Sequence, residues 1–254
     1  MALAELKFFS ESLGMNTNAY VIMPQKSLNG EIGMKSTQYA QNLKCLYLLH
    51  GLSDDCSIWL RRTSIERYAQ QYGICVVMPG AGRSFYTDMK YGGKYYTYIA
   101  KELPAIIHSF FNVSDKREDN YIAGLSMGGY GAMKIALKEG NYCAAAGLSS
   151  VADVKNMTET FKNDYISVFG EDLNIPDSED LFVLAKECDS KPVKPRIFMA
   201  VGTEDFMYKD NVRLKETFES LSFDYKYLEE PGTHEWGFWD KHIQTALYWM
   251  FGNK

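Results

Sequence analysis

The sequence predicts an α/β domain whose central sheet is mostly parallel and covered by helices on both faces. Short apolar runs alternate with segments of helical spacing along almost the whole chain, which is typical of such a sheet. The runs Cys45–Leu49 and Ile74–Met78 are apolar throughout, as strands buried on both faces require. The chain has 254 residues, of which 46% are hydrophobic, and this size suits one domain. We therefore expect a single domain over residues 1–254.

The first third of the chain predicts a hairpin followed by the first parallel strands. Leu6–Ser10 and Ala19–Met23 are short apolar runs separated by turn-forming glycine and asparagine, which indicates two paired strands. Gln25–Asn42 is polar and holds two glycines, so we expect a loop there. Ile58–Tyr72 has helical spacing, and Gly80–Gly93 is a loop rich in glycine and tyrosine.

The rest of the chain continues the alternation of strand and helix. Pro104 predicts the start of a helix or a kink in the helix that runs to about Phe111. Val151–Glu187 is more polar and irregular, which predicts a small cap insertion. The other elements that we expect are strands at Tyr121–Ala123, Cys143–Leu148, Arg196–Val201 and Asp224–Leu228, and helices at Met127–Lys138, Lys209–Leu221 and about Gly237–Phe251.

Composition and charge exclude several classes of protein. A formal net charge of −5 argues against a dedicated nucleic-acid binder. No apolar stretch approaches the roughly 18 residues of a membrane span, so we expect no membrane partner. Glu5, Lys7 and Glu11 precede any sustained apolar run, which is not the pattern of a signal peptide. The five cysteines form no CxxC pair, as expected of free thiols in a reducing compartment. We expect a cytoplasmic protein, and the composition leaves a homo-oligomer open.

The sharpest motif is the GxSxG sequence Gly124-Leu125-Ser126-Met127-Gly128. Such a motif forms a tight turn from a strand into a helix, and the turn exposes the serine hydroxyl above the sheet. An apolar strand precedes this motif and a helix follows it, as the turn requires. We therefore predict that Ser126 is a catalytic nucleophile. The alternative is a glycine-rich turn that serves packing alone.

A serine hydroxyl needs a base to take its proton, and the chain offers four histidines. His108 and His242 lie within predicted helices, and His50 directly follows a strand. His234 lies in a loop between a strand and the last helix, where a general base is well placed. We predict that His234 is the base.

The base in turn needs an acid that orients its ring. In α/β-hydrolases the acid lies between the nucleophile and the histidine in the sequence, at the end of a strand. Asp205 and Glu204 directly follow the strand Arg196–Val201 and meet both conditions. We prefer Asp205, although the sequence does not decide between the two. Asp153 and Asp164 lie in the predicted insertion, where solvated carboxylates are expected.

An oxyanion hole needs two backbone N–H donors, one of which belongs to the residue after the nucleophile. Met127 is that residue. The second donor comes from the loop after an early strand, and the Leu52 N–H in His50-Gly51-Leu52 fits this position. His50 would then shape the turn. The glycines after Pro79 form only an incomplete dinucleotide-binding motif, and the chain has no GxxxxGK or HExxH motif. We therefore expect no cofactor and no metal.

With these motifs in place, the chain resembles the esterase D group of α/β-hydrolases, most closely its bacterial tributyrin esterase branch. The resemblance covers nearly the whole chain and implies the α/β-hydrolase fold. It also implies Ser126, Asp205 and His234 as the triad, Leu52 and Met127 as the oxyanion hole, and short-chain acyl esters as substrates. The motifs that carry it are LLHGLSDD (Leu48–Asp55) with Trp59, RTSIERY (Arg62–Tyr68), VVMP (Val76–Pro79), GLSMGGYGA (Gly124–Ala132), GTEDF (Gly202–Phe206) and GTHEW (Gly232–Trp236).

Relatives in the same group suggest alternative substrates. S-formylglutathione hydrolases carry a cysteine close behind the oxyanion glycine, whereas Cys56 lies further along in this chain. Feruloyl or acetyl-xylan esterases would use the same triad, with the aromatic loop Phe85–Tyr96 and the insertion shaping the site. Related mycolyl transferases pass the acyl group to a sugar. A non-catalytic binding protein on the same scaffold is the alternative of a different class.

For the substrate site we select four aromatic residues. Tyr86 and Tyr91 belong to a tyrosine cluster after the third core strand, where a loop can overhang the nucleophile. Trp59 and Trp236 belong to the motifs that carry the resemblance. Most of the 18 tyrosines are expected to serve packing instead.

Overall fold

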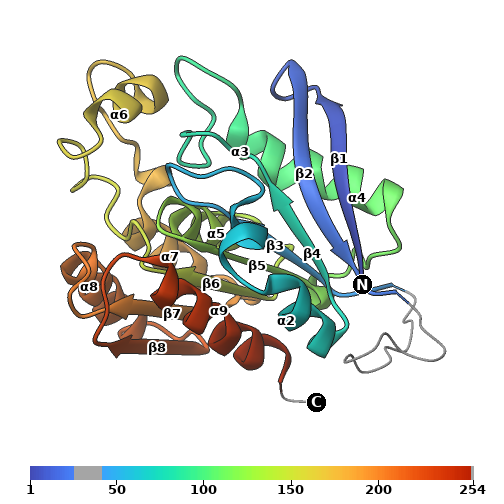
Figure 1. Cartoon of the computed structure of the whole chain (residues 1–254). Coiled ribbons are helices and arrows are strands. Elements are labelled where there is room, and N and C mark those ends of the chain that lie inside the picture. Colours follow the sequence, from blue (N-terminus) through green and yellow to red (C-terminus); the bar gives the residue numbers. More distant parts are fainter. Residues whose placement is uncertain (26–41, 253–254) are drawn as a thin grey trace.

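The computed structural model describes residues 1–25 and 42–252 of the chain. The loop predicted at Gln25–Asn42 therefore lies, apart from its two end residues, outside the described residues. Within the described part, the chain forms one sheet with helices on both faces (Figure 1).

The sheet has eight strands within the described residues, in the order β1-β2-β4-β3-β5-β6-β7-β8. The first two strands form an antiparallel hairpin, and β2 also runs antiparallel to β4. All other neighbours pair in parallel, so the mostly parallel sheet is confirmed. The strands are β1 (Ala2–Ser10), β2 (Met15–Met23), β3 (Cys45–Leu49), β4 (Cys75–Pro79), β5 (Asn120–Leu125), β6 (Ala144–Leu148), β7 (Arg196–Gly202) and β8 (Tyr225–Glu230).

The helices divide between the two faces of the sheet (Figure 1). Successive side chains of a strand point to opposite faces, and each face carries its own apolar core. In β3, Tyr47 belongs to the core under α4, α5, α7 and α8, whereas Leu46 and Leu48 belong to the core under α1, α2 and α9. The α-helices are α1 (Ile58–Arg62), α2 (Ile65–Tyr72), α3 (Tyr95–Thr97), α4 (Leu103–Phe110), α5 (Met127–Lys138), α6 (Lys162–Phe169), α7 (Leu181–Asp189), α8 (Tyr208–Glu219) and α9 (Trp236–Phe251).

The region of helical spacing over Ile58–Tyr72 forms two helices, because the backbone is not helical at Thr63. This residue is extended, with φ −136° and ψ 173°. Its Oγ1 donates to the Trp59 carbonyl at 2.6 Å and accepts from the Ile65 N–H at 3.1 Å. A short hydroxyl side chain that bonds to nearby backbone competes with helical hydrogen bonds, so α1 ends and α2 begins there. Pro104 lies at the start of α4, where its missing N–H is tolerated.

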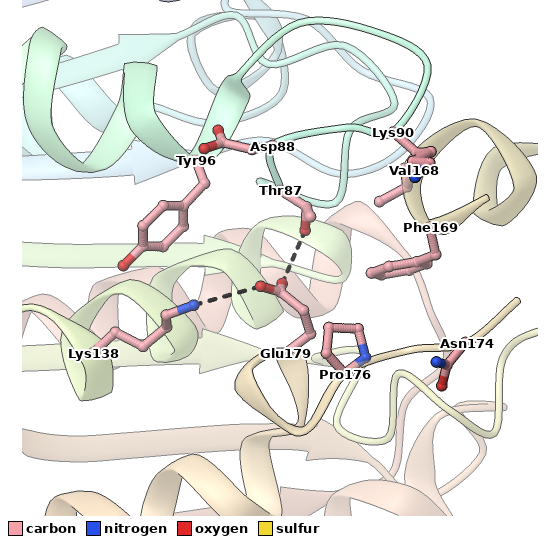
Figure 2. A pocket seen from close by; sticks show the side chains of 10 residues that line it. All are labelled: Thr87, Asp88, Lys90, Tyr96, Lys138, Val168, Phe169, Asn174, Pro176 and Glu179. Atoms are coloured by element: carbon pink, nitrogen blue, oxygen red, sulfur yellow. Dashed lines mark hydrogen bonds and ion pairs between the residues drawn. The ribbon is translucent and has the colours of Figure 1, made fainter.

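The segment predicted as an insertion, residues 151–187, is anchored to the body by buried polar groups. The ammonium of Lys134, in the middle of α5, is fully buried and lies 2.6 Å from a carboxylate oxygen of Glu179. Thr87 also donates to that carboxylate, and Lys138 approaches its other oxygen (Figure 2). Thr87, Lys138 and Glu179 also border a cavity of about 370 Å³ between α5, the 80–93 loop and the end of α6. The later part of the segment, from Leu181, belongs to α7 and packs in the core.

Candidate active site

Ser126 lies at the sharp turn between β5 and α5, at the carboxyl ends of the parallel strands. Its backbone has φ 53° and ψ −118°, a left-handed conformation that is rare for a residue with a side chain. The turn is held because the Ser126 N–H donates to the Leu148 carbonyl at 2.8 Å, and the Ser126 carbonyl accepts from Val151 and Tyr130. Such local strain persists only where the surrounding structure enforces it, and it is frequent at functional sites.

The two glycines of the motif allow this turn to form. A Cβ at Gly124 would lie 2.3 Å from the Gly128 carbonyl oxygen. A Cβ at Gly128 would lie 2.5 Å from the Leu49 carbonyl oxygen and 2.6 Å from that of His50. Because all three obstacles are backbone atoms, only glycine lets α5 start this close to β3 and β5.

The structure brings Ser126, His234 and Asp205 together in one chain of hydrogen bonds. His234 Nε2 lies 3.1 Å from Ser126 Oγ, and His234 Nδ1 lies 2.9 Å from Asp205 Oδ2. A carboxylate only accepts, so Nδ1 carries the ring proton and Nε2 is free to accept the serine proton. Asp205 also accepts from the Met207 N–H at 2.8 Å, which fixes its side chain at the end of β7.

Glu204, the other acid considered, has a different environment. Its carboxylate accepts a hydrogen bond from the Gly232 N–H, and this lowers the pKa of Glu204. Asp164 pairs with Arg83, and Asp153 pairs with Arg213. The aspartate that reaches the ring of His234 is therefore Asp205.

The two predicted oxyanion donors, Met127 and Leu52, come from the start of α5 and from the loop after β3, which lines the cleft together with Ser126. Met127 begins α5, and the N–H groups of a first helical turn have no intrahelical partner. The Gly51–Leu52 peptide is held through its carbonyl, which accepts from His50 Nδ1 at 2.7 Å and from the Asp54 N–H at 3.2 Å. In a trans peptide the C=O and N–H groups point in opposite directions, so the Leu52 N–H points away from His50.

The ring of His50 holds this peptide in one defined protonation state. Its Nε2 accepts from the Ala81 N–H at 2.9 Å, so the proton must be on Nδ1, which donates to Gly51. Burial lowers the pKa of His50, which keeps the ring neutral. His50 thus shapes the turn, as expected, and links the Leu52 loop to the chain after β4.

The serine opens into a cleft of about 670 Å³. Leu52 and Gly51 line one part of it, and a group of residues around His234 lines another. The members of the second group are Phe206, Glu235, Trp236 and Trp239. The rings of Phe206 and Trp239 contact the imidazole of His234, at centroid distances of 4.6 Å and 4.9 Å.

Of the four aromatic residues selected for the substrate site, Trp236 lines this cleft and the other three do not. Trp59 is buried, donates to the Leu49 carbonyl at 3.0 Å, and packs edge to face against Trp236. Tyr86 is fully buried, and its hydroxyl donates to the His50 carbonyl. Tyr91 is 58% exposed and lies outside the cleft. The clustering of tyrosines in the sequence does not distinguish tyrosines that are buried in the core from tyrosines that line a substrate site.

The cleft also contains residues that sequence reasoning missed. Arg62, Arg83, Phe161 and Phe206 line it. Phe206 directly follows the proposed acid, and Arg62 begins one of the family-like motifs, so both were within reach of the sequence. Phe161 and Arg83 carried no signal, because the contacts that place them join segments about 80 residues apart.

Comparison with known proteins identifies the family. Residues 10–250 match the Esterase family, described as "Putative esterase". The chain belongs to this family. It is 33% identical to an acetyl esterase of Caldicellulosiruptor saccharolyticus, over 98% of each protein.

Solved structures of esterases and serine hydrolases have the same fold. The fluorophosphonate-binding serine hydrolase FphF of Staphylococcus aureus has a TM-score of 0.88 and 34% identity, over 98% of each chain. The S-formylglutathione hydrolase FrmB of the same organism has a TM-score of 0.85 and 33% identity, over 99% of this chain and 100% of that chain. A ferulic acid esterase at 21% identity shares the fold, with a TM-score of 0.80.

The protein is therefore an esterase of the serine hydrolase type with an α/β-hydrolase fold. Within the described residues, no group of three or more potential ligand side chains is arranged to hold a metal ion. No helix in that part of the chain is long and apolar enough to cross a bilayer.

Proposed function

We propose that this esterase is a carboxylesterase that hydrolyses short-chain acyl esters through an acyl-enzyme on Ser126. The observation that carries the proposal is the continuous hydrogen-bonded chain from Ser126 Oγ through His234 to Asp205. The serine hydrolase character of the 34% identical FphF, which binds fluorophosphonate, supports it.

The proposed reaction has two halves that use the same groups. Ser126 Oγ attacks the ester carbonyl while His234 Nε2 takes the hydroxyl proton, and His234 then gives that proton to the departing alcohol. Water enters next, loses a proton to His234 and attacks the acyl-enzyme, and the carboxylic acid leaves as Ser126 regains its proton. Asp205 keeps Nδ1–H oriented and stabilises the imidazolium in both halves.

In both halves the carbonyl oxygen gains negative charge. We place it on the N–H groups of Leu52 and Met127, which come from the loop after β3 and the start of α5. Each donor of this kind typically contributes about 3–4 kcal/mol to transition-state stabilisation.

The acyl group is the finer part of the proposal. The acetyl esterase relative favours a short acyl chain, and the tributyrin esterase motifs agree with that choice. A feruloyl ester is a weaker fit, since the ferulic acid esterase is only 21% identical.

A Ser126→Ala variant tests the chemistry. We expect turnover of p-nitrophenyl butyrate to fall by about 10⁶-fold, since removing the nucleophile of a triad has that effect. Circular dichroism and thermal unfolding should match the wild type, because the hydroxyl is small and lies at the cleft. The assignment of Ser126 would be disproved by a folded variant that retained a tenth or more of the wild-type activity, which is about 10⁵ times the residual activity expected.

Thioester hydrolysis is the second candidate, because FrmB is an S-formylglutathione hydrolase at 33% identity. Cys56 does not favour it. That thiol is buried, burial raises its pKa to about 11, and it does not line the cleft. Comparing kcat/KM on S-formylglutathione and p-nitrophenyl acetate separates the two candidates.

A further inference from the structure

One wall of the cleft comes from the segment predicted as an insertion. Within the described part of residues 151–187, Phe161 is the residue that lines the cleft, and it lies directly before α6. Its ring packs against Phe85 at a centroid distance of 5.9 Å, and Phe85 in turn packs against Tyr165 of α6 at 4.9 Å. The position of the Phe161 ring therefore depends on how α6 is held against the 80–93 loop.

The chemistry of the proposed reaction separates the two sides of the cleft. His234 must protonate the departing alcohol, so the alcohol lies beside His234 and its neighbours Phe206 and Trp236. The acyl group then extends toward the lining residues from the other elements, among them Leu52 and Phe161. A large aromatic ring on that side limits the length of an acyl chain.

An ion pair at the edge of the cleft fixes α6. Arg83 Nε and Nη2 donate to the two carboxylate oxygens of Asp164, at 2.6 Å and 2.8 Å, in a bidentate geometry. Asp164 is in the first turn of α6, three residues after Phe161. Arg83 Nη1 also reaches the Leu52 carbonyl oxygen at 3.5 Å. One guanidinium thus joins α6, the 80–93 loop and the loop that carries the Leu52 N–H.

The far end of α6 is held separately. The Lys90 and Tyr91 N–H groups donate to the carbonyls of Val168 and Ser167, at 2.8 Å and 3.0 Å. Beyond α6, the buried pair of Lys134 and Glu179 holds the following turn to α5. Loss of the Arg83–Asp164 pair would therefore remove the ion pair at the end of α6 that carries Phe161 and leave the hydrogen bonds at the other end in place.

We propose that Phe161 limits the length of the acyl chain that this esterase accepts, and that Arg83 is a positioning residue that holds Phe161 in place through Asp164. The proposal rests on the esterase reaction at Ser126 described above. It goes beyond that reaction by assigning the acyl side of the cleft and the contact that sets its size.

The first test is a chain-length series with Phe161→Ala. We expect the ratio of kcat/KM for p-nitrophenyl octanoate to that for the butyrate to rise by about tenfold or more, because a larger apolar site accommodates the extra methylenes. Phe161→Leu should shift the ratio in the same direction by less. Phe169→Ala is the matched control. This ring lies at the other end of α6 and lines the cavity of about 370 Å³ beside Glu179 rather than the cleft (Figure 2). An unchanged ratio in Phe161→Ala, or an equal shift in Phe169→Ala, would overturn the proposal.

The second test separates positioning from general stability. Arg83→Met should raise the same ratio and lower kcat on the butyrate, whereas Arg83→Lys should recover part of both. Arg213→Met is the control, because the Arg213–Asp153 pair joins the same segment to α8. The two ion pairs are similarly exposed: the side chains are 55% and 13% exposed for Arg213 and Asp153, and 55% and 17% exposed for Arg83 and Asp164. If Arg83→Met changes only thermal stability, or if Arg213→Met shifts the ratio equally, Arg83 has no positioning role.

Fluorophosphonate labelling of each variant distinguishes the two levels of proposal. A wild-type protein with no labelling at Ser126 and no esterase activity overturns the proposed function, and the acyl assignment falls with it. A labelled and active wild type with an unchanged ratio in Phe161→Ala overturns the acyl assignment alone.

Discussion

The sequence predicts only that His50 shapes a turn, and the structure shows by which contacts it does so. His50 is not part of the proposed triad. Its ring donates to the carbonyl of the Gly51–Leu52 peptide and accepts from the Ala81 N–H, and in the described residues no other side chain links this carbonyl to the backbone after β4. A neutral ring with its proton on Nδ1 satisfies both contacts, whereas an imidazolium would have no acceptor for the Ala81 N–H. The direction of the Leu52 N–H therefore depends on a buried histidine that never reaches the substrate.

Replacing His50 should impair catalysis more than substrate binding. In His50→Ala we expect kcat to fall by about 10²-fold with a smaller change in KM, since one oxyanion donor loses its orientation. Steady-state kinetics on p-nitrophenyl butyrate measure both values. His242→Ala is the control, because this histidine is also buried but pairs with Glu230 away from the cleft. Equal losses of kcat in the two variants would assign the effect to stability.

The elements around the proposed nucleophile show which local patterns were sufficient. The helix predicted at Met127–Lys138 matches α5 at both ends, because glycine spacing and the strand before it fix the turn. Helical spacing over Ile58–Tyr72 did not show that the segment forms two helices, because the spacing continues on both sides of Thr63. Apolar spacing predicts which face is buried, but a side chain that bonds to its own backbone decides where the helix ends.

A glycine substitution tests the close contact at the start of α5. Gly128→Ala should lower the free energy of unfolding by about 3 kcal/mol or more, since the new Cβ would lie within 2.6 Å of two backbone oxygens. Esterase activity should fall with it, because α5 carries the Met127 N–H. Urea denaturation gives the free energy. Gly140→Ala is the control, since nothing lies within 4 Å of a Cβ there. A Gly128→Ala variant as stable as Gly140→Ala would contradict the tight contact.

At the scale of the molecule, the buried ion pair of Lys134 and Glu179 joins the segment predicted as an insertion to the core. Burial lowers the pKa of Lys134 to about 8, although Glu179 acts in the opposite direction. Burial alone would raise the pKa of Glu179, but the charges of Lys134 and Lys138 lower it overall. The two charges therefore stabilise each other, and Lys138 contributes to the stabilisation of Glu179.

Removing one partner of this pair should be strongly destabilising. We expect Glu179→Gln to lower the free energy of unfolding by about 3 kcal/mol near pH 7, because it leaves the buried ammonium without a counter-charge. Since the pKa of Glu179 is lowered by folding, its stabilisation is present above its ordinary pKa and is lost as the pH falls through the folded value. The difference between wild type and variant should therefore shrink as the pH falls below the ordinary pKa of a glutamate.

Urea denaturation at several pH values measures this difference. Lys155→Met is the control, because the exposed Lys155 pairs with Asp177 and Asp180 at the surface and its loss should change stability by less than about 1 kcal/mol. A difference between wild type and Glu179→Gln that stayed constant with pH would show that the carboxylate charge is not responsible.

The cytoplasmic location and the oligomeric state stay predictions.

The sequence by itself determined the sheet, the turn at Ser126 and the order in which Asp205 and His234 follow it. These features depend on neighbours in the chain: apolar runs, glycines on either side of one serine, and polar residues at strand ends. Tertiary structure decided between Asp205 and Glu204, and it placed Tyr86 and Trp59 inside the protein rather than in the cleft. It also placed Phe161 and Arg83 at the cleft. Such placements depend on tertiary contacts between segments that are distant in the sequence, and these contacts cannot be inferred from a single sequence.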